Sequence, residues 1–71
     1  MNVDLVMTLI GDDRPGLVES ISQAVAAHGG NWQESRMARL GGKFAGILRA
    51  EVPEEQRDSL ETQLRRLADE G

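Results

Sequence analysis

The alternation of apolar and polar residues predicts a strand near the start of the chain. Residues 3–10 have one fully apolar face and one mixed face. The apolar face carries Val3, Leu5, Met7 and Leu9, and the other carries Val6 and Ile10 beside Asp4 and Thr8. A strand that is apolar on both faces is usually central in a sheet, so we expect a central strand here.

The next segment has the spacing of an amphipathic helix. We expect a helix over residues 15–28, with a buried stripe made of Leu17, Ile21, Ala24, Val25 and His28. Pro15 suits the first helical position, and Asp12 or Asp13 can cap the helix start. Gly29 and Gly30 end the helix. The strand therefore meets the helix in a short turn over residues 11–17.

Two further strands follow. Residues 31–40 alternate poorly, which favours an edge strand with a bulge. Gly41 and Gly42 predict a hairpin turn, and residues 44–52 alternate cleanly as its second strand. Gly46 lies in the middle of that strand and indicates a bulge or the close approach of another backbone.

A second helix opens at Pro53, with acidic residues in its first turn and arginines near its end, as the helix dipole favours. Its buried stripe contains Leu60, Leu64, Leu67 and Ala68, and Gly71 is a candidate C-terminal cap. The element order predicts an α+β, ferredoxin-like βαββα fold, with an antiparallel sheet and two helices on one face. This is the βαββαβ unit without its last strand.

The predicted organisation is a single domain over residues 1–71, truncated before a fourth strand. In the complete βαββαβ unit the first and third strands are central, and the fourth lies beside the first. Without that strand, one edge of strand 3–10 is open, and an open apolar edge invites association. We therefore expect a fragment of a longer protein or a partner that covers this edge.

The composition of the chain excludes several kinds of site and disfavours several classes of partner. The 71 residues carry a net charge of −4 with no Cys and one His, so disulfides, thiolate metal sites and histidine clusters are excluded. The acidic balance and the two aromatic residues, Trp32 and Phe44, argue against direct nucleic-acid binding. No apolar run approaches the ~20 residues of a membrane span, and we expect a cytoplasmic protein. Chains below roughly 70–80 residues commonly need a partner, so we expect a homo-oligomer.

Catalysis is not expected. An enzyme needs a nucleophile and a base held together in a cleft, and the chain has no Cys and only His28, at the far end of the first helix from the turn. It also lacks a phosphate-binding or dinucleotide-binding glycine pattern. We expect no enzymatic activity, no cofactor and no metal.

The turn at residues 11–17 is the candidate binding site. The first turn of a helix has free backbone N–H groups and attracts a carboxylate, and Gly16 leaves the approach open. Asp12 and Asp13 could bind an amine, and Arg14 a carboxylate. The structural alternative is that Asp13 caps the helix, Pro15 forms its first turn, and Gly16 permits tight packing.

Three segments carry a family resemblance. Gly11-Asp12-Asp13-Arg14-Pro15-Gly16-Leu17, Gly29-Gly30-Asn31-Trp32 and Gly42-Lys43-Phe44-Ala45-Gly46-Ile47-Leu48 resemble the signatures of ACT domains, in the branch of the glycine cleavage system transcriptional repressors. The resemblance implies a regulatory module that binds a small amino acid effector and dimerises, with effector near the interface. A transcription regulator is then a possible partner. The ligand-binding residues that it implies are Asp12, Asp13, Arg14, Pro15, Gly16, Leu17 and Asn31.

Two other functions stay open. The same fold could be a pure interaction module that dimerises or pairs with a regulator and binds no effector. For Asn31 the alternative is a turn asparagine that bonds its own backbone. An RNA-binding domain of this fold is disfavoured, because the strands lack stacking aromatics and the chain is acidic.

Overall fold

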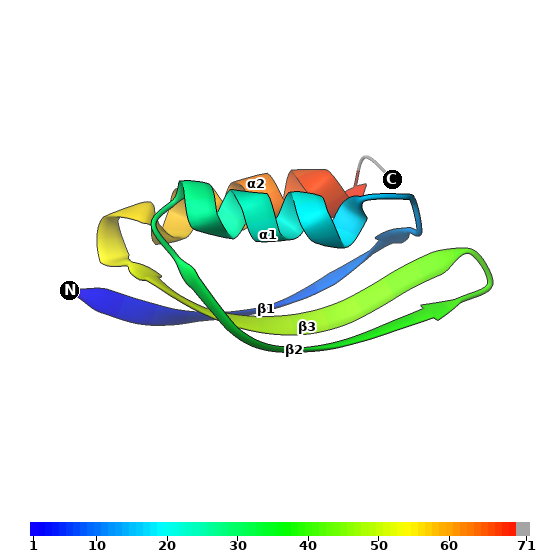
Figure 1. The fold of residues 1–71 in the computed structure, drawn as a ribbon, viewed down its shortest axis with the longest axis horizontal. Coiled ribbons are helices and arrows are strands. Elements are labelled where there is room, and N and C mark those ends of the chain that lie inside the picture. The colour runs from blue at the N-terminus through cyan, green and yellow to red at the C-terminus, as the bar shows by residue number, and fades with distance from the viewer. Residues whose placement is uncertain (70–71) are drawn as a thin grey trace.

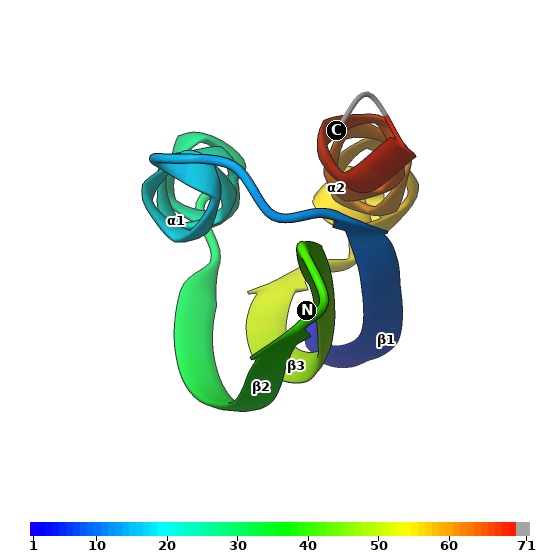
Figure 2. The same cartoon turned by 90° about the vertical axis from the view of Figure 1, so that its right-hand side faces the viewer.

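The predicted order of elements is confirmed by the computed structural model, which describes residues 1–69 (Figure 1). The elements are β1 (Asn2–Asp12), α1 (Leu17–Ala27), β2 (Asn31–Leu40), β3 (Lys43–Pro53), the short 3₁₀ helix η1 (Glu54–Gln56) and α2 (Arg57–Asp69). The three strands form one layer, and both helices lie on the same face of it (Figures 1 and 2). The fold is the βαββα, ferredoxin-like arrangement that the sequence predicts.

The sheet is antiparallel in the order β1-β3-β2, so β3 is its central strand. β1 pairs with β3 along its whole length, from Asn2 opposite Pro53 to Asp12 opposite Lys43. In the described part of the chain β1 has this one neighbour. The prediction of a central position is therefore wrong there, whereas the predicted open edge of β1 is confirmed. The central position was predicted from the apolar residues Val6 and Ile10 on the second face of β1. These side chains are 57% and 65% exposed, on the sheet face that the helices leave open.

The bulge expected in residues 31–40 is confirmed. The register of β2 on β3 shifts between Trp32 and Glu34, which explains the broken alternation of β2. Gly46 belongs to no bulge, because it pairs regularly with Met37. A Cβ atom there would lie 2.9 Å from Cγ of Met37, so the glycine makes room for a side chain of β2.

The core lies between the sheet and the two helices. β1 and β3 contribute alternate side chains, and each helix contributes one stripe. The largest fully buried side chains are Phe44, Leu5, Leu17, Ile21, Leu48, Leu60, Leu64, Val25 and Val52. Burial of each such side chain contributes about 1.5–3 kcal/mol, and this is the main force that holds the helices to the sheet.

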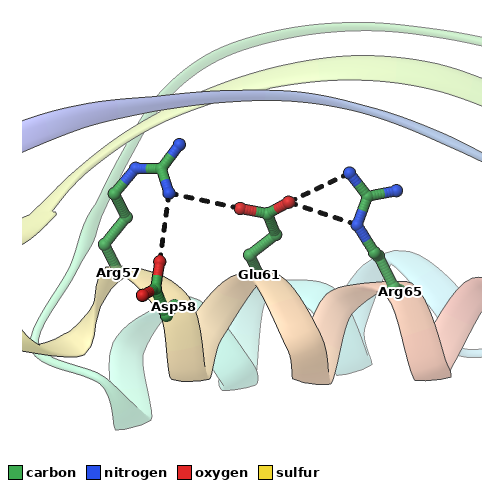
Figure 3. Close-up of polar contacts among 4 residues, drawn as sticks. All are labelled: Arg57, Asp58, Glu61 and Arg65. Atoms are coloured by element: carbon green, nitrogen blue, oxygen red, sulfur yellow. Dashed lines mark hydrogen bonds and ion pairs between the residues drawn. The ribbon is translucent and has the colours of Figure 1, made fainter.

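α2 carries a chain of ion pairs along one side (Figure 3). Glu61 accepts from Arg57 at 3.3 Å and from Arg65 at 3.0 Å, each four residues away, and Arg57 also contacts Asp58. Exposed pairs of this kind contribute little, about 0.3–0.5 kcal/mol each. The predicted cap at Gly71 lies outside the described residues. Within residues 1–69 no helix has the length and apolar character needed to span a membrane.

Candidate functional site

The turn between β1 and α1 differs from the prediction in how the helix starts. α1 begins at Leu17 rather than Pro15, and its N-cap is Gly16, with φ of 78°. No side chain caps the helix, so the prediction of an Asp12 or Asp13 cap is wrong. The left-handed backbone at Gly16 is the reason that glycine is needed there, since other residues adopt this conformation at a cost.

The two aspartates bind the β2–β3 hairpin instead of the helix. Asp13 accepts a hydrogen bond from Nε of Arg39 at 2.9 Å, and its N–H donates to the carbonyl of Gly42 at 3.0 Å. Asp12 pairs with Lys43, the residue opposite it in the sheet. These contacts tie the turn to the tip of the hairpin.

The first helical turn keeps free donors. The N–H of Leu17 bonds the carbonyl of Arg14 at 3.3 Å, and the N–H of Ser20 bonds that of Gly16 at 2.9 Å. The N–H groups of Val18 and Glu19 have no acceptor among residues 1–69. They are the third and fourth of the four N–H groups that an α-helix leaves unpaired at its start, counted from the N-cap Gly16.

A cavity of about 350 Å³ lies against this turn. Its lining residues are Asp13, Arg14, Pro15, Gly16, Leu17, Val18, Glu19 and Arg39. These residues include two arginines, two acidic residues and the first three residues of α1, two of which carry the unpaired N–H groups.

The structure brings together five of the seven predicted site residues. Asp13, Arg14, Pro15, Gly16 and Leu17 line the cavity, whereas Asp12 and Asn31 do not. Asn31 is exposed and lies opposite Glu51 of β3, while the turn lies beside Lys43. Eight strand residues separate those positions, about 27 Å at 3.4 Å per residue. Within one chain, Asn31 is therefore at the other end of α1 from the cavity.

Arg39 is the lining residue that sequence reasoning missed. It bonds Asp13 and stands over the ring of Phe44, 5.8 Å from the ring centre. The position of Arg39 could have been predicted from the hairpin turn at Gly41 and Gly42. It fixes the register that puts Arg39 opposite Phe44, at the end of the sheet where β1 runs into the turn.

The sequence profile described as ACT domain matches residues 4–71. The chain belongs to the ACT domain family. This agrees with the resemblance of its three glycine-containing segments to ACT signatures. The profile match spans the turn, the helices and all three strands of the described structure.

Two curated relatives place this ACT domain near transcriptional repressors. The glycine cleavage system transcriptional repressors of Escherichia coli (strain K12) and Shigella flexneri are each 46% identical to it over 44 residues, which is 62% of this chain. That alignment covers 23% of each repressor. The chain thus spans about a quarter of the length of these relatives.

Solved structures agree on the fold. A crystal structure of an unknown protein from Galdieria sulphuraria has a TM-score of 0.84 and 30% identity, and covers 94% of this ACT domain and 39% of that chain. A protein provisionally described as a glycine cleavage system transcriptional repressor matches with a TM-score of 0.83, 30% identity and the same coverage. The ACT domain from GTP pyrophosphokinase of Chlorobium tepidum has a TM-score of 0.75 at 17% identity, over 97% of this chain and 91% of that one. The last likeness concerns the fold alone; that ACT domain is part of a GTP pyrophosphokinase.

Proposed function

We propose that this ACT domain is a regulatory module that binds a small amino acid at the turn formed by residues 12–17. The observation that carries the proposal is the pair of unpaired N–H groups, on Val18 and Glu19, beside a cavity of about 350 Å³. A helix start with free donors is a natural place for a carboxylate, because the N–H groups and the helix dipole both favour negative charge.

The cavity also offers groups for the other end of an amino acid. The carboxylates of Asp13 and Glu19 can accept from an ammonium group, and Arg14 can add a charge-assisted bond to the effector carboxylate. Asp13 is already held by Arg39 at 2.9 Å, so its position is fixed before an effector arrives. Preorganised partners of this kind lower the entropy cost of binding.

Asn31 belongs to the proposed site only through a second copy of the chain. It lies at the opposite end of α1 from the cavity, so it reaches an effector bound at the turn only from a neighbouring domain. We therefore propose a homodimer in which the start of β2 of one copy approaches the turn of the other.

The proposed biological role follows from the relatives. Two of them are repressors of the glycine cleavage system, and this chain covers 23% of each. We propose that the domain acts in transcription regulation, through dimerisation or contact with a regulator protein. We propose no catalytic role for it, and we place its action in the cytoplasm, where bacterial DNA is transcribed.

Thermal melting with a panel of amino acids tests effector binding. Glycine, L-serine and other small amino acids are added at millimolar concentration, with glycinamide as the control that keeps the amine and lacks the carboxylate. A ligand at 100 times its Kd stabilises by about 2.7 kcal/mol. We expect a rise in Tm with at least one amino acid and none with glycinamide. An unchanged Tm across the panel would contradict the proposal.

A second candidate, a pure interaction module, is supported by the exposed sheet. In residues 1–69 the outer edge of β1 pairs with no strand, and Val6, Ile10 and Ile47 are 57%, 65% and 44% exposed. Unpaired edges and exposed apolar side chains favour association. Sedimentation separates the candidates: a dimer without any amino acid response favours the interaction module, and a monomer at tens of micromolar argues against it.

A further inference from the structure

The turn of the candidate site is in direct contact with the last turn of α2. Gly11, just before the cavity residues, lies so close to Ala68 that a Cβ atom on it would be 2.1 Å from the Ala68 carbonyl oxygen. Only glycine permits this approach of two backbones. β1 therefore ends against the C-terminal turn of α2.

Arg14 adds a second link to the same helix end. Its Nη2 donates to the carbonyl of Leu67, 53 residues away in the chain. The last carbonyls of a helix have no partner within the helix, and a cation near them is favoured by the helix dipole. Arg14 also lines the cavity, so one half-buried guanidinium contacts both the candidate site and α2.

We propose that Arg14 is a positioning residue that couples occupation of the cavity to the seating of the last turn of α2. The inference rests on the proposed function, because it concerns what an effector bound at the turn does to the rest of the fold. Its basis is geometric: within the described residues, no other side chain that lines the cavity has a hydrogen bond to α2.

The sign of the coupling follows from the shape of the guanidinium. It has five N–H donors in a rigid fork, and one hydrogen bond to Leu67 is its only bond within residues 1–69. An effector carboxylate can therefore bind other N–H groups while the Leu67 bond persists. The Arg14 side chain loses rotamer entropy when its first hydrogen bond forms. Because the second bond then forms with an already fixed side chain, each bond lowers the entropy cost of the other. An effector should then tighten the end of α2.

Hydrogen exchange at the backbone N–H groups of Leu67 and Ala68 tests the proposal. Without any amino acid, Arg14→Gln should speed their exchange about three- to tenfold, since it removes a charge-assisted bond to the helix end. Arg39→Gln is the matched control: it removes the same charge from the same cavity, but the partner of Arg39 is Asp13. It should leave exchange at the end of α2 unchanged. Equal exchange in the two variants would overturn the link.

Glycine and L-serine are the probes for the coupling itself. In the wild-type protein, saturation with the one that binds should slow exchange at Leu67 and Ala68 about threefold or more. Arg14→Lys keeps the charge but lacks the fork, so it should bind the amino acid without slowing exchange there. Binding that leaves the exchange of wild-type Leu67 unchanged would overturn the coupling alone. If neither amino acid binds, the proposed function fails and the coupling fails with it, whatever Arg14→Gln shows about α2.

Discussion

Replacing Gly16 by alanine separates binding from stability at the turn. Gly16 has φ of +78°, and an added Cβ atom would meet no heavy atom within 4 Å. The cost is therefore conformational rather than steric: about 1–2 kcal/mol for an L-residue in the left-handed region, offset by about 0.4–1 kcal/mol from the stiffer unfolded chain. A net loss near 1 kcal/mol lowers Tm by about 4–8 °C in a domain of this size.

Gly29 provides the matched control. It has φ of +71°, and a Cβ atom there would make only ordinary contact, 3.6 Å from Cγ of Pro53. Gly29→Ala should therefore lose about as much stability as Gly16→Ala. Gly29 follows the far end of α1 and does not line the cavity at the turn. The two variants thus share the strain, and only the methyl group at Gly16 stands at the cavity wall of its own chain.

The assay is the amino acid-induced rise in Tm of each variant. The added methyl group at Gly16 stands at the cavity wall, and we expect it to weaken binding about tenfold. At an amino acid concentration 100 times the wild-type Kd, the stabilisation then falls from about 2.7 to about 1.4 kcal/mol. Gly29→Ala should retain more of the response, because its methyl group meets Pro53 of its own chain rather than the cavity. An equal response in the two variants would refute the idea that the effector binds at the turn.

Two other variants test the packing. Gly11→Ala should cost more stability than Gly46→Ala, because its Cβ atom meets the backbone of Ala68 at 2.1 Å whereas that of Gly46 meets the movable side chain of Met37 at 2.9 Å. In urea unfolding we expect the free energy of unfolding to fall by about 1–3 kcal/mol for Gly11→Ala and by about 1 kcal/mol for Gly46→Ala. The reverse order would contradict the close contact between Gly11 and Ala68. Leu64→Ala removes a fully buried side chain and should lower the free energy of unfolding by about 2–5 kcal/mol. We expect the circular dichroism signal of the folded state to be lost at 37 °C. A folded signal that persists there would contradict the tight packing of Leu64.

Much of the fold is encoded in local patterns. Alternation predicts the first and third strands, and two glycines predict the hairpin. The broken alternation of residues 31–40 predicts an edge strand with the bulge observed between Trp32 and Glu34. The position of β1 in the sheet was not predictable in this way. A mixed apolar face arises equally in a central strand and in a strand whose second face is open, as with Val6 and Ile10.

The turn that the sequence singles out lines a cavity, but the contacts of its side chains were not predictable. The glycine-proline turn marks the cavity, yet Asp12 and Asp13 were expected to cap α1 and instead pair with Lys43 and Arg39. Those partners come from the β2–β3 hairpin, more than 20 residues away, and a local capping rule does not include them. Likewise, no local rule joins Arg14 to α2, because that contact exists only once α2 has packed on β1.

The most direct test of effector binding is a titration of ¹⁵N-labelled protein with glycine and L-serine, followed by NMR. We expect saturable shifts in the backbone N–H signals of Val18 and Glu19, the two unpaired donors at the cavity. They should appear below about 10 mM, where a site with a millimolar Kd is mostly occupied. Val18 and Glu19 signals that stay fixed while either amino acid is added, or saturable shifts confined to the far end of α1, would contradict it.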